Sequence, residues 1–128
     1  MQGKRNTFQK EERLCGKKNI DRLYEEGKAF LSYPVRIVFC KAPQNNIPAR
    51  CLISVPKKKI KHATDRNRIK RQIREAYRLN KQPLYQSLQE KDYQLFFAVS
   101  FIGEKEESTD FMVKKIKIAL TKLGELLP

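Results

Sequence analysis

The sequence predicts an α+β fold in which one small sheet packs against helices. Two observations carry this prediction. Segments in which apolar residues alternate, as in half-buried strands, are interspersed with segments in which they recur every three or four positions, as in amphipathic helices. In chain order the segments read helix, strand, strand, helix, strand, helix, which is typical of a layered α+β domain. A chain of 128 residues suits one core, so we expect residues 1–128 to form a single domain.

The first predicted helix is short and follows a polar, basic segment. That segment offers few apolar anchors, so we expect residues 1–12 to be flexible. Asn19 is a suitable N-cap and Gly27 a suitable helix end. Ile20 and Tyr24, four residues apart, share one face. We expect Ile20 to pack in the core, whereas the Tyr24 ring can pack while its hydroxyl stays in water.

Three segments alternate as strands do. Residues 35–40 and 50–55 flank a loop, 42–49, that is rich in turn residues, so we expect the two strands to form an antiparallel hairpin. Residues 93–101, YQLFFAVSF, are the strongest strand signal in the chain and follow a polar link, 82–91, with room for a helical turn.

The last predicted helix runs from a cap at Thr109 to about residue 126. Its lysines lie mostly outside one apolar stripe, so we interpret it as a helix that covers the core. The stripe consists of Met112, Ile116, Ala119, Leu120, Leu123 and Leu127.

Residues 57–81 hold a large share of the positive charge. We predict a helix over 65–79 with Asp65 as its N-cap. At about 100° per residue, its apolar side chains fall on one side and its basic ones in a stripe about 100° wide on the other. The acidic Glu75 falls off this stripe. The stripe holds Asn67, Lys70, Arg71, Arg74, Arg78 and Lys81, with Arg66 and Arg68 beside it.

The charge balance points to a polyanionic partner. The chain has 28 Lys and Arg against 14 Asp and Glu, a net charge of +14 that folding does not require. Interleaved Glu and Lys would gain about 0.2–0.5 kcal/mol per pair, and the basic stripe forgoes that gain. A solvated helix face is the alternative interpretation. Arginine dominates the stripe and its planar fork suits phosphate, which favours a polyanion over a solvated face. Nucleic acid is the commonest partner of so basic a chain, and an anionic membrane surface comes second.

Membrane and secretion signals are weak in this chain. No apolar run reaches the roughly 18 residues that a membrane span needs. The N-terminal segment has no apolar stretch of signal-peptide length. We therefore expect a cytoplasmic protein with no membrane partner.

The sequence offers no evident active site. A Ser or Cys nucleophile needs a histidine, and His62 in a lysine-rich linker is the only one. The acids are too scattered for a two-metal nuclease. Cys15, Cys40 and Cys51 lack the spacing of a zinc site. We expect reduced thiols, no catalytic residue and no metal held by the protein alone.

RNA suits this layout better than DNA. Basic side chains contact phosphates, and an aromatic ring such as Tyr24 can stack on single-stranded bases. The basic helix could enter a major groove, but nothing resembles a helix-turn-helix pair. RNA is recognised by shape and backbone, so we expect RNA and not DNA.

Residues 63–76, ATDRNRIKRQIREA, resemble the signature of the bacterial ribonuclease P protein component. That family carries an Arg-Asn-Arg core followed by Lys-Arg and then Arg-Glu at this spacing. The lead-in ISV-P-KK at 53–58, the pattern RL…IDRLY…GK at 13–28 and KDY at 91–93 are similar too. The resemblance spans roughly residues 13–123.

The resemblance implies a small α/β sandwich like ribosomal protein S5 domain 2, with a left-handed βαβ crossover at the basic helix. It implies the protein subunit of ribonuclease P, a ribonucleoprotein endonuclease that removes the 5′ leader from precursor tRNA. The RNA subunit would carry catalysis and hold Mg²⁺, with one protein and one ribonuclease P RNA in the complex. The alternatives are a general or ribosome-associated RNA-binding protein of the same fold and a DNA-binding regulator.

The resemblance also assigns residues. The family's Arg-Asn-Arg helix binds the catalytic RNA, and its central cleft, between the first helix and the sheet, binds the single-stranded leader. Matching RNA-binding positions are Arg66, Asn67, Arg68, Lys70, Arg71 and Arg74, to which we add Arg78, Lys57 and Lys58 from the same basic segment. Matching leader-binding positions are Ile20, Tyr24, Arg36 and Val38.

Overall fold

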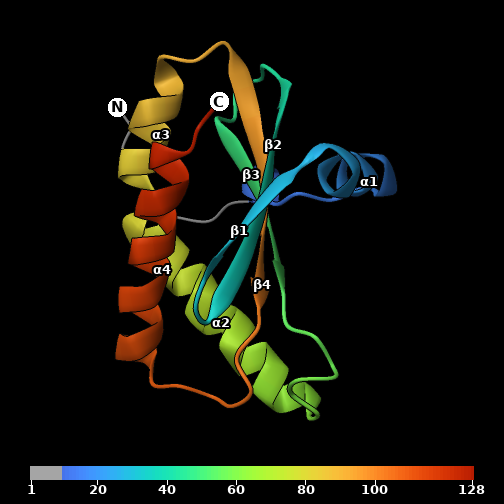
Figure 1. Cartoon of the computed structure of the whole chain (residues 1–128), viewed down its shortest axis with the longest axis vertical. Coiled ribbons are helices and arrows are strands. Elements are labelled where there is room, and N and C mark those ends of the chain that lie inside the picture. The colour runs from blue at the N-terminus through green and yellow to red at the C-terminus, as the bar shows by residue number, and fades with distance from the viewer. Residues whose placement is uncertain (1–9) are drawn as a thin grey trace.

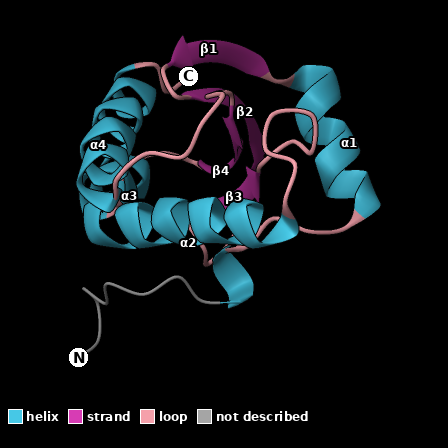
Figure 2. Cartoon of the chain, turned by 90° about the horizontal axis from the view of Figure 1, so that it is seen from below, coloured by secondary structure: helices cyan, strands magenta, loops and turns pink. Residues whose placement is uncertain are grey.

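One four-stranded sheet separates two unequal layers of helices (Figure 2). The computed structural model describes residues 10–128. Helices α2 (Ala63–Asn80), α3 (Gln82–Gln89) and α4 (Thr109–Glu125) cover one face, and α1 (Lys17–Glu26) covers the other. The predicted layered α+β fold is confirmed.

The strand order makes the basic helix part of a crossover (Figure 1). Strands β1 (Lys28–Ser32), β2 (Val35–Pro43), β3 (Ala49–Ser54) and β4 (Tyr93–Phe101) lie in the order β1-β2-β4-β3. β2 pairs antiparallel with both β1 and β4, whereas β3 pairs parallel with β4. Parallel neighbours need a long connection, and here α2 and α3 supply it. This is the βαβ unit that the family resemblance implied.

The predicted hairpin between the second and third strands is wrong, because β4 lies between β2 and β3. The two strands run antiparallel but lie two sheet spacings apart, about 10 Å. The loop between them therefore passes the start of β4 and bonds to it. Gln94 Nε2 donates to the Ile47 carbonyl at 2.9 Å, and the Leu95 amide donates to the Pro48 carbonyl at 3.0 Å.

Alternating residues of the central strands build two core clusters, one on each face of the sheet, where the sequence predicted one core. Ile37 and Phe97 point towards α2 and α4 and are fully buried. Val38 and Ala98 point towards α1 in a smaller cluster with Leu23. Because β4 is covered on both faces, it reads as one nearly continuous apolar run.

The N-terminal segment packs along the sheet in its described part. Residues 1–9, most of the segment expected to be flexible, lie outside the described residues. Lys10–Glu12 form a 3-10 turn in which Glu12 is buried. Arg13 then bridges in parallel to Cys51, and the Leu14 amide donates to the Cys51 carbonyl at 3.0 Å. The segment thus runs along the β3 edge of the sheet.

Three predicted helix caps are wrong by one to three residues. α1 begins at Lys17 after Gly16, and the Asn19 side-chain amide instead donates to the Cys15 carbonyl. α2 begins at Ala63, so Asp65 lies in its first turn and does not cap it. For α4 the cap is Ser108, whose hydroxyl accepts from the Phe111 amide at 3.1 Å.

Other boundaries agree or extend the prediction. Gly27 ends α1 as expected, with its amide donating to the Leu23 carbonyl at 2.8 Å. Strand β1 was not predicted, because five residues show too little alternation. α3 is a two-turn helix where only a turn was expected, with Pro83 in its first turn. Among residues 10–128, no helix is both long and apolar enough to cross a membrane.

Candidate nucleic-acid interface

The buried side of α2 fixes which of its residues face water. Ile69, Ile73 and Ala76 are fully buried, and the Tyr77 ring packs edge-on against Phe97 with 5.6 Å between centroids. This apolar side is the predicted one. It turns Asn67, Lys70, Arg71, Arg74 and Arg78 outward, and each of them is exposed or half-buried.

Three cations of this outer side are uncommitted. Within the described part of the chain, no hydrogen bond or ion pair joins Lys70, Arg71 or Arg74 to another residue. In the described part of the chain, these three neighbouring positive charges therefore have no acidic side chain paired with them. Such a group has the chemistry to bind several phosphates.

Arg66 has a structural role at the start of α2. Its Nη1 donates to the Ile60 carbonyl at 2.9 Å and to the Lys61 carbonyl at 2.7 Å. These bonds tie the linker after β3 to the first turn of the helix. Lys57 and Lys58 are exposed in a turn of the same linker, so they extend the basic surface beyond the N-terminal end of α2.

Acidic partners hold two further arginines. Arg68 Nη1 donates to Glu106 of the loop before α4, and Arg78 donates through Nε to Glu75 at 3.1 Å. Glu75 was predicted to lie off the stripe, but one helical turn brings its carboxylate to Arg78. The Arg78 hydrogen bond lowers the pKa of the Glu75 carboxyl and raises that of the guanidinium. The basic side of α2 therefore carries fixed acids as well.

An open hollow of ≈ 500 Å³ marks the centre of this surface. Arg13 reaches it from the N-terminal segment and brings the fifth arginine, a residue that helical periodicity could not place here. Arg13 is placed here by a tertiary contact, the parallel bridge that joins it to Cys51 of β3. The hollow is lined by Arg13, Arg68, Arg71, Gln72, Arg74, Glu75, Arg78 and Thr109.

Lys81 does not belong to the basic stripe, contrary to prediction. α2 ends at Asn80, and the chain turns into α3 at Lys81. Its side chain is buried and ion-paired with Glu12. The charge of Lys81 is thus neutralised inside the protein and unavailable to a ligand.

A second surface lies on the opposite face of the sheet, beside α1. Tyr24 of α1 is 48% exposed, and Ile20, one turn earlier, is half-buried against the small core cluster. Val38 is only 3% exposed because it packs under α1 and Gly27. Of the four predicted leader-binding residues, Tyr24 and Arg36 are therefore the ones whose side chains lie open to solvent.

The strand register extends this second surface across the sheet. Arg36 on β2 pairs with Ser100 on β4, and Ser100 pairs with Ser54 on β3. Paired residues share a face, so these three side chains form one polar row next to the part that α1 covers. Both serines are half-buried. The row provides a floor of small hydroxyl groups with one arginine.

The thiols and acids of the described residues form no reactive centre. Burial raises the pKa of Cys40 and of Cys51, which leaves both as neutral thiols. Within residues 10–128, no group of three or more His, Cys, Asp or Glu side chains could hold a metal ion. The five arginines that line the hollow give the described surface the chemistry to bind a polyanion.

Comparison with known proteins gives a consistent result. The family model Ribonuclease P matches residues 8–124. The ribonuclease P protein component of Porphyromonas gingivalis is 41% identical over 103 residues, covering 80% of this chain and 74% of that protein. That of Chlorobium phaeobacteroides is 31% identical over 123 residues, covering 89% and 84%.

Solved structures share the fold. The RNase P protein of Staphylococcus aureus aligns with a TM-score of 0.68 and 22% identity, covering 91% of this chain and 98% of that one. The RNase P protein of Thermotoga maritima aligns with a TM-score of 0.68 and 22% identity, covering 87% and 96%.

Proposed function

Since the chain belongs to the ribonuclease P protein family, we propose that α2 docks on the RNA subunit of ribonuclease P. The chain is then the protein component of a ribonucleoprotein endonuclease of tRNA processing. One observation carries the docking proposal: Lys70, Arg71 and Arg74 lie uncommitted on the outer side of a rigidly packed helix. Cations with no acidic partner can bind phosphates without first losing a side-chain contact.

The remaining predicted RNA-binding residues fall into two groups. Asn67, Lys57 and Lys58 are exposed near the start of α2 and extend the same contact. Arg66 supports the contact indirectly, because its guanidinium holds the linker that carries the lysines. Arg68 and Arg78 are paired with carboxylates, so they can join through their remaining N–H groups or by exchanging the carboxylate for a phosphate.

We further propose that the α1 side of the sheet receives the single-stranded 5′ leader of precursor tRNA. A strand lying on the polar row would place its phosphates near Arg36 and its hydroxyl groups near Ser54 and Ser100. Tyr24 offers an exposed ring for base stacking. Ile20 lies beside Tyr24, whereas Val38 supports the surface from beneath α1.

The protein assists and the RNA carries out catalysis in this proposal. Mg²⁺ would be held by phosphates of the RNA subunit, because the surfaces described above present cations and hydroxyl groups where a metal would need clustered carboxylates. One protein would bind one RNA, in the cytoplasm where precursor tRNA is made. The basic protein screens phosphate repulsion between the RNA subunit and its substrate.

Reconstitution tests the proposal. The protein is added to a bacterial ribonuclease P RNA at low Mg²⁺ with precursor tRNA as substrate. We expect cleavage at the mature 5′ end only when both components are present. Cleavage by the protein alone, or no gain over the RNA alone, would contradict it.

A further inference from the structure

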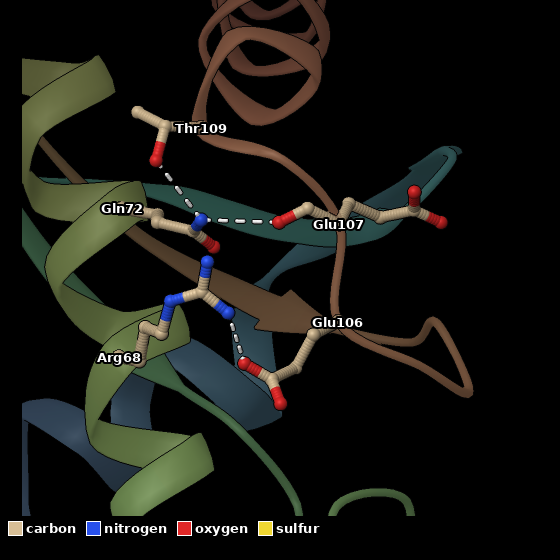
Figure 3. A network of polar contacts seen from close by, with 5 residues as sticks. All are labelled: Arg68, Gln72, Glu106, Glu107 and Thr109. Atoms are coloured by element: carbon tan, nitrogen blue, oxygen red, sulfur yellow. Dashed lines mark hydrogen bonds and ion pairs between the residues drawn. The ribbon is translucent and has the colours of Figure 1, made fainter.

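The loop between β4 and α4 is clamped to the basic helix (Figure 3). Gln72 of α2 is 5% exposed, and its Nε2 donates to the Glu107 carbonyl at 3.1 Å and to the Thr109 hydroxyl at 3.2 Å. A buried amide with two tertiary hydrogen bonds fixes the loop at this point. The neighbouring Glu106 is thereby held close to α2.

Glu106 faces Arg68 (Figure 3). Arg68 is one of the residues that line the five-arginine hollow. The side chains of Arg68 and Glu106 are 50% and 31% exposed. Ion pairs this exposed contribute little to stability, so the Arg68–Glu106 pair has no evident purpose in folding. Glu75, paired with Arg78, places a carboxylate in the lining of the hollow itself.

Fixed acids among phosphate-binding arginines affect different RNAs unequally. An RNA that binds through Lys70, Arg71 and Arg74 without placing a phosphate beside Glu106 or Glu75 would meet no like charge. An RNA that places a phosphate beside either acid would meet one, and like charges in contact are costly. The acids therefore lower the affinity of wrongly placed polyanions more than that of the matching one.

We propose that Glu106 and Glu75 are specificity-determining residues of the α2 surface. Resting on the proposed function, this inference adds that α2 selects its RNA by repulsion as well as by attraction. Gln72 is the positioning residue, because it holds the loop that aims Glu106.

The test compares two RNAs with the full-length protein. Affinity is measured for a bacterial ribonuclease P RNA and for an unrelated duplex RNA of similar length. We expect Glu106→Gln to raise affinity for the unrelated RNA about three- to tenfold and to change the ribonuclease P RNA affinity less than about twofold. Glu75→Gln should act in the same direction.

Glu104→Gln is the matched control. It makes the same change in net charge in the same loop, at an exposed residue for which no contact with α2 is seen. We expect it to raise both affinities slightly and equally. If Glu106→Gln behaves like Glu104→Gln, net charge alone explains the effect and the inference is wrong.

Gln72→Leu tests the clamp without changing charge. After thermal unfolding has shown that the variant is folded, it should lose selectivity in the same direction as Glu106→Gln. Unchanged selectivity in the folded variant would overturn the positioning role.

Arg71→Ala with Arg74→Ala separates the two proposals. If both affinities stay unchanged, the proposed RNA surface fails, and the inference with it. If both fall while Glu106→Gln matches its control, only the inference fails.

Discussion

Lys81 donates a hydrogen bond to Glu12 across the junction between α2 and the N-terminal segment, and the two residues are only 2% and 7% exposed. The Tyr85 hydroxyl donates to the same carboxylate and lies 3.0 Å from the Tyr77 hydroxyl. This network fixes the segment that carries Arg13 to the end of α2. It thereby links the N-terminal segment to the candidate RNA-binding surface.

Breaking this pair should destabilise the protein strongly. Glu12→Gln or Lys81→Met would leave one buried charge without its partner, which costs about 3–5 kcal/mol in the free energy of unfolding. Urea unfolding measures the loss. The double variant should lose less than the sum of the single variants, because it buries no unpaired charge. Strictly additive losses would contradict a coupled pair.

Stability should fall at alkaline pH through the same network. Burial is the main cause that raises the pKa of Tyr77 and of Tyr85 above the usual value. Their folded pKa values exceed the unfolded ones, so the stabilisation is complete below about pH 10 and declines above it. Tyr85→Phe should reduce the slope of this decline, whereas Tyr33→Phe at an exposed turn should not. Equal slopes in all three proteins would refute the assignment.

Gly27 is required where α1 meets the sheet. A Cβ at this position would lie 2.3 Å from the Leu23 carbonyl oxygen and 2.7 Å from Val38 Cγ1. Gly27→Ala should therefore lower the free energy of unfolding by about 1–3 kcal/mol. Gly124 in α4 has no heavy atom within 4 Å of a Cβ, so Gly124→Ala should leave stability unchanged or raise it by up to about 1 kcal/mol. Thermal unfolding of the two variants measures the difference. Equal stability would be evidence against the close approach of residue 27 to Leu23 and Val38.

Tyr24 should matter for the leader and not for the body of tRNA. Tyr24→Ala should weaken binding of leader-bearing precursor tRNA to the reconstituted enzyme by about 1–3 kcal/mol, the range for one stacked base. Binding of leaderless tRNA should change little. Tyr33→Ala is the matched control, because Tyr33 is similarly exposed, at 54%, but lies in the turn between β1 and β2 and not on α1. If Tyr24→Ala weakens binding of leader-bearing and leaderless tRNA equally, the assignment of the leader to this surface is wrong.

Side-chain periodicity predicted the parts of the fold that depend on one element at a time. The buried side of α2 and the two faces of β2 and β4 follow from spacing alone. The hairpin prediction was wrong because the sequence of a short loop does not show whether the two strands that it connects are paired or are separated by a third strand. The two-sided apolar pattern of residues 93–101 was the available signal, since it is typical of a central strand.

The candidate site was predicted in outline and not in its charge pairing. Helical geometry placed Arg71 and Arg74 on one side correctly. It could not show that Glu106 would reach Arg68 or that Glu12 would bury Lys81, because those partners lie 38 and 69 residues away in sequence. Tertiary contacts thus decided which cations remain available.

The salt dependence of RNA binding tests the central claim, that the outer side of α2 contacts phosphate. The affinity of the protein for ribonuclease P RNA is measured across a range of salt concentrations. Arg71→Ala with Arg74→Ala should lower the log–log slope by about 0.7–0.9 per lost contact. Lys114→Ala with Lys117→Ala removes the same charge from the exposed side of α4 and should leave the slope unchanged. An unchanged slope in the α2 variant, or an equal drop in the α4 variant, would contradict α2 as the RNA-binding surface.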